Sequence, residues 1–286
     1  MRETKIIMGM PVTVEIVENA DTAGVLVDFS SLMREVFDYF TYVDEKFSTY
    51  KSTSEISAIN AGKLVLADYS DDMKEIFMLA EKTKRETDGY FDIVNQDGKY
   101  DPSGIVKGWA IWNAGKILRR RGVENFLVDA GGDVQTAGLK SGDKNSSGKN
   151  SIGEKWSIGI ADPFAKNYGG TVMTGAPSKV VNVIRVSGEG VATSGTAIRG
   201  QHIYNPHKRT FDQKDSHGET GDGIYDIVSL TVIGSNIYEA DRFATAAFAM
   251  GRRGIEFIEN VEGLEGYMID KDGMAIMTSG FKKYVV

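Results

Sequence analysis

The chain has 286 residues, a formal net charge of −7 and no cysteine. This length suffices for one large domain, and an acidic chain without a basic stripe is unlike a nucleic-acid-binding protein. Without cysteine there are no disulfides, thiolate nucleophiles or cysteine-ligated metals. No stretch approaches the length of a membrane span, and the first twenty residues lack the apolar core of a signal peptide. We therefore expect no integral membrane segment and a cytoplasmic protein by default, with an exported mature form left open.

Hydrophobic periodicity in the first half of the chain predicts helices after an N-terminal strand region. Alternation over 5–17, with a break at Gly9, predicts two strands or one interrupted strand. Apolar residues at helical spacing over about 22–46 predict a long amphipathic helix. Three further helices are expected: one that opens at 54–56, one over 70–87 capped by Ser70, and one over 104–121 that ends at Gly122.

The second half is richer in strands, and its order of elements indicates the fold class. Strands are predicted over 126–130, 134–137, 156–161, 180–186 and 227–234, followed by a helix over 239–250 and a hairpin that joins 266–270 to 275–279. The Gly- and Ser-rich segment 138–155 is expected to be a mobile surface loop. Because helices and strands do not alternate regularly, we expect a single α+β domain over 1–286, with a mixed or antiparallel sheet flanked by helices.

A carboxylate and a hydroxyl share one face of the helix predicted over 239–250. Asp241 and Thr245 stand at positions i and i+4, so one side chain lies above the other. Two oxygen ligands in this arrangement suit Mg²⁺. The alternative is structural: Asp241 interacts favourably with the helix N-terminus, and Thr245 bonds to its own backbone. The helix by itself leaves both interpretations open.

Lys107 lies one turn inside the helix predicted over 104–121, after an Asp-Pro-Ser-Gly turn. A lysine near a helix N-terminus is placed to reach a phosphate group. The alternative is an ordinary proline-initiated helix start with a solvated lysine.

Three other segments contain candidate functional side chains. His202 follows a Ser- and Gly-rich turn and is either a general base or a structural histidine. The sequence Gly89-Tyr90-Phe91-Asp92 offers two aromatic rings and a carboxylate, either for a ring-shaped ligand or for the core and a helix end. Asp133, after a Gly-Gly turn, is interpreted as structural.

These segments occur together and in one order, and the set resembles the ApbE family of FAD:protein FMN transferases. The resemblance spans nearly the whole chain. Its matching pieces are MGM (8–10), FSTYKSTSEISAIN (47–60), DGYFD (88–92), DPSGIVKGWA (101–110), DAGGDV (129–134), WSIGIADP (156–163), ATSGTAIRGQHIYNP (192–206) and TVIGSNIYEADRFATAAFAMG (231–251).

The resemblance implies a reaction and a set of site residues. The activity would be the Mg²⁺-dependent transfer of FMN from FAD, the substrate, to a Thr or Ser hydroxyl of an acceptor protein, with release of AMP. His202 matches the essential histidine of the family, and the metal ligands match Asp241, Thr245 and the backbone carbonyl of Gly104. The positions that match FAD contacts are Met8, Tyr50, Tyr90, Phe91, Asp92, Asp101 and Lys107.

The chain departs from the family pattern just after the histidine. The usual pattern has Asp where this chain has Asn205, and 207–210 lacks the glycine that normally follows. Asn205 cannot supply a negative charge to stabilise a protonated His202. Two alternatives to the transferase therefore stay open: an FAD pyrophosphatase that uses water as the nucleophile, and an FAD-binding protein without turnover.

Overall fold

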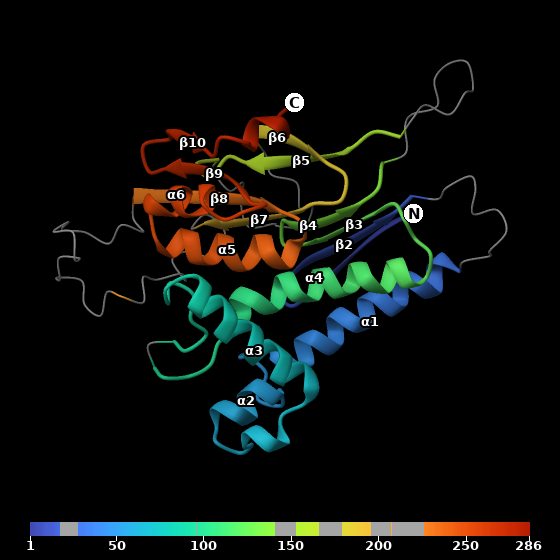
Figure 1. Ribbon diagram of the computed structural model, residues 1–286. Helices are drawn as coiled ribbons and strands as arrows, with labels where there is room; N and C mark the ends of the chain where they lie inside the picture. Colours follow the sequence, from blue (N-terminus) through green and yellow to red (C-terminus); the bar gives the residue numbers. More distant parts are fainter. Residues whose placement is uncertain (18–27, 96, 141–152, 166–178, 196–206, 208–225) are drawn as a thin grey trace.

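The computed structural model describes residues 1–17, 28–95, 97–140, 153–165, 179–195, 207 and 226–286. Within these ranges an eight-stranded sheet runs through the middle of the molecule, in the order β1-β2-β3-β4-β7-β8-β9-β10 (Figure 1). Each neighbouring pair is antiparallel. The strands are β1 (Arg2–Ile7), β2 (Met10–Ile16), β3 (Phe126–Ala130), β4 (Asp133–Ala137), β7 (Gly190–Gly195), β8 (Ile227–Gly234), β9 (Glu265–Asp270) and β10 (Ala275–Met277).

Helices cover one face of this sheet, and a small second sheet covers part of the other (Figure 1). Helices α4 and α5 lie directly against the large sheet, α1 packs on α4, and α2 and α3 lie beyond them. The helices are α1 (Phe29–Phe47), α2 (Glu55–Asn60), α3 (Asp71–Glu86), α4 (Ser103–Arg120), α5 (Ile237–Ala249) and α6 (Arg253–Glu259), with short 3₁₀ turns η2 (Leu66–Asp68) and η4 (Phe281–Lys283). The second sheet pairs β5 (Trp156–Ala161) with β6 (Val180–Val186).

The alternation of side chains along the central strands explains why both faces are covered. On β8, Leu230 and Val232 point into the core beneath the helices, whereas Ile233 belongs to a second apolar cluster under β5 and β6. A strand that is apolar on both faces needs cover on both faces. Trp156 provides part of this cover: its ring is buried, and its indole N–H donates to the Ala137 carbonyl 3.0 Å away.

The α+β class and the sheet flanked by helices are confirmed, and most predicted boundaries agree with the structure to within two residues. The helix predicted over 22–46 is an exception, because α1 begins at Phe29. The Asp28 carboxylate accepts the Ser30 and Ser31 amides as an N-cap, and Asp28 itself has a non-helical backbone. Residues 18–27 lie outside the described part, as do 141–152, most of the segment predicted as a mobile loop. The described ends of that segment are joined by a bridge between Lys140 and Glu154.

Candidate functional site

Two helices approach closely because α4 has glycine where α5 crosses it. A Cβ atom at Gly108 would lie 2.7 Å from the Cβ of Asp241, and one at Gly104 would lie 3.3 Å from Thr245 Cγ2. The i, i+4 glycines of α4 therefore face the i, i+4 pair Asp241 and Thr245 of α5. The structure thus brings the three predicted metal ligands together, although they come from segments far apart in the sequence.

The start of α5 is fastened to the large sheet, which fixes where Asp241 lies. Asn236 caps the helix, its side chain accepting the Glu239 amide. The buried Gln135 of β4 accepts the Ile237 amide at 2.8 Å and donates to the Gly188 carbonyl. Both the oxygen and the nitrogen of the Gln135 side chain are therefore hydrogen-bonded. They connect the start of α5 to β4 and to the turn before β7.

Asp241 is buried in the helix crossing and is held in one orientation. Its Oδ2 accepts the amide N–H of Gly108 at 2.8 Å, and its side chain is only 4% exposed. Burial raises the pKa of Asp241 to about 7; Asp133 raises it as well, whereas Lys107 and the Gly108 amide act to lower it. The carboxylate therefore lies where an additional positive charge would stabilise it.

Asp133, interpreted from the sequence as structural, belongs to this site. It begins β4 after Gly131 and Gly132, which both have positive φ, and its side chain is 2% exposed. Its Oδ1 accepts the Thr193 amide at 2.9 Å, and its Oδ2 forms an ion pair with the Lys107 ammonium. The same ammonium lies 3.6 Å from Asp241 Oδ1. The signal in the sequence was a charged residue at the start of an otherwise uncharged strand. No local sequence pattern related Asp133 to Lys107.

The chemistry of this group fits a divalent cation. Within the ranges that the structure describes, no three His, Cys, Asp or Glu side chains converge on one point as metal ligands. The donors at the crossing are instead carboxylate, hydroxyl and backbone carbonyl oxygens, the set that Mg²⁺ prefers. In a regular helix the amide N–H of residue 108 donates a hydrogen bond to the carbonyl of residue 104. Here that amide donates to Asp241 Oδ2, which fixes the carboxylate beside this turn of α4.

The predicted flavin contacts at 90–92 lie beside the crossing and differ in exposure. Phe91 is 3% exposed, and its ring edge lies 3.3 Å from where a Gly104 Cβ would be, so it packs underneath the site. Tyr90 is half-buried, accepts a hydrogen bond from Arg253 at 2.5 Å, and meets the His207 ring edge-on at 4.5 Å. Asp92 accepts the Val94 amide and pairs with Lys84 at 2.7 Å. Of the two aromatic rings, that of Tyr90 is the more accessible.

The remaining predicted flavin contacts, Tyr50, Asp101 and Met8, differ in their surroundings. Tyr50 is 97% exposed, whereas Asp101 accepts the Ser103 amide at the start of α4. Met8 lies in the two-residue turn between β1 and β2, where it and Gly9 both have positive φ, as a type I′ turn requires. A cavity of about 300 Å³ lies nearby, lined by Thr49, Ser57, Asn60, Ala61, Asn95, Lys99, Tyr100 and Asp101.

The predicted catalytic residue His202 lies outside the described residues, together with Asn205. Its role therefore stays a prediction. Nearby in sequence, His207 is described, and it rests against Tyr90 and Gly89.

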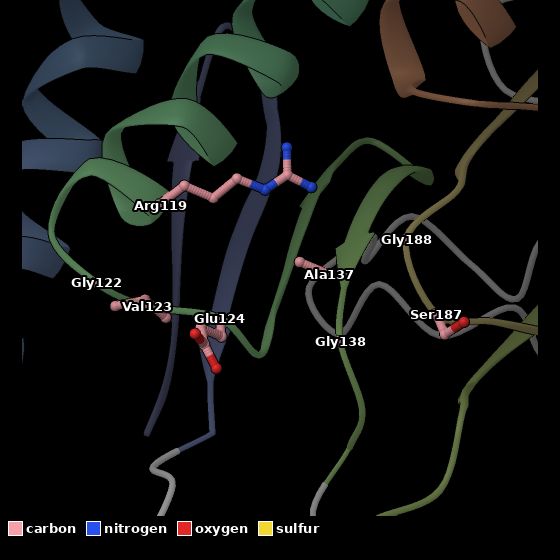
Figure 2. Close-up of a pocket in the computed structure, with 8 residues that line it drawn as sticks. All are labelled: Arg119, Gly122, Val123, Glu124, Ala137, Gly138, Ser187 and Gly188. Carbon is pink, nitrogen blue, oxygen red and sulfur yellow. The ribbon is translucent and has the colours of Figure 1, made fainter. Parts of the chain in front are cut away.

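A second cavity, of about 370 Å³, lies away from the helix crossing (Figure 2). Arg119 extends across it from the last turn of α4, opposite Ala137 and Gly138 at the end of β4. An α-helix rises about 1.5 Å per residue, so Arg119 lies about 18 Å along α4 from Lys107. This cavity is separate from the candidate site.

Comparison with known proteins assigns the family. The ApbE family model matches residues 8–97 and 94–268 of this chain. An FAD:protein FMN transferase of Escherichia coli K12 is 28% identical over 193 residues, which cover 65% of this chain and 47% of that protein. A protein of the same name from Treponema pallidum is 25% identical over 190 residues, covering 63% of this chain and 46% of that protein. The chain therefore spans about half the length of the curated relatives it matches.

Solved structures agree on the fold. The flavin transferase ApbE of Vibrio cholerae superposes with a TM-score of 0.73 at 20% identity, over 99% of this chain and 98% of that one. The ApbE protein of Thermotoga maritima also gives 0.73, at 18% identity and the same coverage. An apo flavinyl transferase ApbE from Pseudomonas stutzeri gives 0.73 at 20% identity, over 99% and 96%.

The antiparallel sheet, its covering helices and the crossing of α4 and α5 thus define an ApbE-type fold. The chain belongs to the ApbE family. Among the described helices, none is long and apolar enough to span a membrane.

Proposed function

We propose that this protein transfers FMN from FAD to a Thr or Ser hydroxyl of an acceptor protein in a Mg²⁺-dependent reaction. The observation that carries the proposal is the buried group of Asp241, Asp133 and Lys107 at the helix crossing, with Gly104 and Thr245 beside it. Two buried carboxylates that share one ammonium leave a net negative charge, which suits a divalent cation. Membership of the ApbE family, and the name that its curated relatives carry, support the same activity.

Asp241, Thr245 and the Gly104 carbonyl would hold Mg²⁺. When bound, the ion neutralises the FAD pyrophosphate and the charge that develops on the leaving group. The ammonium group of Lys107 would add a second positive charge close to the same phosphates. Phe91 and the Gly108 amide keep the two helices in register beneath these ligands, so that little reorganisation is needed during the reaction.

The transfer is a displacement at the FMN-side phosphorus of FAD. The acceptor hydroxyl oxygen forms a new P–O bond to this phosphorus, while the bond from phosphorus to the bridging oxygen breaks and AMP leaves with that oxygen. His202 takes the hydroxyl proton as the oxygen attacks. The products are AMP and an acceptor protein that carries FMN through a phosphoester.

Side chains around the crossing would bind the remainder of FAD. Tyr90 offers an aromatic ring, and Arg253, bonded to its hydroxyl, adds a positive charge beside it. The polar cavity next to Asp101 has room for only part of a dinucleotide. We therefore expect FAD to lie across the face formed by Tyr90, Lys107 and the start of α4.

One assay separates transfer from the two alternatives. The protein is incubated with FAD, Mg²⁺ and a candidate acceptor, and both AMP and protein-bound flavin fluorescence are measured. Transfer gives AMP only together with flavin on the acceptor, and an acceptor whose Thr is replaced by Ala abolishes both. AMP release without acceptor labelling indicates an FAD pyrophosphatase, which Asn205 leaves open. FAD binding with neither product indicates a flavin-binding protein and refutes the proposed activity.

A further inference from the structure

Among the residues that the structure describes, Lys107 is the basic side chain that lies close to both buried carboxylates of the candidate site. Its ammonium forms an ion pair with Asp133 and lies 3.6 Å from Asp241 Oδ1. The lysine side chain is 19% exposed, whereas the two carboxylates are 2% and 4% exposed. The lysine is therefore the member of this group that reaches the surface, whereas the two carboxylates are enclosed.

Backbone hydrogen bonds hold each carboxylate independently of the lysine. The Thr193 amide of β7 donates to Asp133 Oδ1, and the Gly108 amide of α4 donates to Asp241 Oδ2. Each carboxylate uses its other oxygen towards the ammonium. If the ammonium moved away from Asp241, that second oxygen would be left facing the site in the same position.

The two ion-pair contacts are unequal. The ammonium makes a direct contact with Asp133 but only a longer one with Asp241. It can therefore leave Asp241 without leaving Asp133, so Asp133 serves as its anchor. A flexible four-carbon stem with a compact charge suits such a change of partner better than the planar guanidinium of arginine.

We propose that Lys107 is the internal counter-ion of the divalent-cation site and that Asp133 is the positioning residue that retains it. Without a divalent cation, the ammonium lies near both carboxylates and offsets one of their two negative charges. On cation binding, it gives up Asp241 and stays on Asp133, on the side where the phosphates of the substrate bind. This inference rests on the proposed function, because it assumes a cation at Asp241, Thr245 and the Gly104 carbonyl.

If Lys107 competes with the cation, the variants at Lys107 and Asp133 should differ in divalent-cation affinity in an order that a purely structural role would not produce. Since the ammonium competes for Asp241, Lys107→Met should bind a divalent cation roughly tenfold more tightly or better. Asp133→Asn frees the ammonium to sit on Asp241, and it should weaken cation binding by a similar factor. The double variant lacks the competitor and should bind at least as tightly as the native protein. If Asp133 were itself a ligand, the double variant would bind as weakly as Asp133→Asn.

The experiment is a Mn²⁺ titration of the full chain followed by electron paramagnetic resonance, with and without FAD, and with Mg²⁺ competition. Lys116→Met, on the same helix beyond the site, is the matched control for loss of one lysine and should leave the affinity unchanged. Lys107→Arg keeps the charge and should not bind more tightly than the native protein. If Lys107→Met is too unstable to purify, the double variant, which removes both partners of the closer pair, carries the test.

Several outcomes overturn the inference. Lys107→Met binding Mn²⁺ no more tightly than the native protein, or a double variant binding no more tightly than Asp133→Asn alone, would show that the lysine does not compete. Equal weakening by Asp133→Asn in the native and Lys107→Met backgrounds would make Asp133 a ligand. If the native protein transfers FMN with Mg²⁺ but the variants give either of these results, this inference is refuted and the proposed function stands. Native protein that binds no Mn²⁺ with or without FAD overturns both.

Discussion

Gly108→Ala tests whether the close crossing of α4 and α5 builds the site. The added Cβ would lie 2.7 Å from Asp241 Cβ, 2.9 Å from Asp241 Oδ2 and 3.0 Å from the Ile237 carbonyl. All three atoms belong to α5: one is a Cβ, one is a backbone oxygen, and the third is the Oδ2 that the Gly108 amide holds in place. The two helices must therefore separate or shift along one another.

The magnitude follows from three contributions. Overpacking of this kind costs about 1–3 kcal/mol of unfolding free energy. Loss of the hydrogen bond from the Gly108 amide to the buried carboxylate costs about 1.5–3 kcal/mol more. Alanine recovers about 1 kcal/mol through its higher helix propensity. We expect a net loss of about 1.5–5 kcal/mol, a sizeable part of the about 5–15 kcal/mol of a typical domain.

Urea unfolding followed by circular dichroism measures this loss, and Gly115→Ala on the same helix is the control. A Cβ at Gly115 would meet the Phe126 ring edge at 3.3 Å and Gln135 Cγ at 3.6 Å, contacts that a small shift relieves. Its effect should be under about 1 kcal/mol. Gly108→Ala should also weaken divalent-cation binding, because it displaces Asp241 from Gly104. A variant as stable as Gly115→Ala, with native cation affinity, would refute the close-crossing argument.

Three further predictions address the chemistry and the pH dependence. Asp241→Ala should abolish Mg²⁺-dependent flavin transfer while circular dichroism shows a folded protein. Thr245→Val should have a smaller effect and raise the Mg²⁺ concentration that transfer requires. Full activity of Asp241→Ala at low Mg²⁺ would contradict the metal assignment. Burial raises the pKa of Asp129 from 3.8 to about 6, so its contribution to stability is present below about pH 4 and lost as the pH rises through 6. Asp129→Asn should therefore gain up to about 3 kcal/mol relative to the native protein between pH 4 and 7 in urea unfolding, and a pH-independent difference contradicts this. His202→Ala should slow FMN transfer by a factor of about 10² to 10⁴ with FAD affinity nearly unchanged, and a native transfer rate would exclude it as the base.

Local patterns in the sequence determined most of the secondary structure. The side-chain alternation of β8 and the helical spacing within α1 decide which residues face the core, because the period of a regular element is a property of its backbone. Ser54 and Ser70 were recognisable as helix starts, and the structure shows both side chains accepting an amide three residues later. The family resemblance, which depends on motifs in one order, also came from the sequence alone.

Only the tertiary structure decided which charges meet. Lys107 is on α4 and Asp133 on β4, and their ion pair depends on how α4 packs against the sheet. That packing is set by long-range contacts such as Gly108 on Asp241 and Gln135 on the start of α5, for which a single sequence carries no periodic signal. For the same reason Phe91, predicted as a ring that contacts flavin, lies buried under Gly104, because burial results from the whole packing arrangement rather than from residue type.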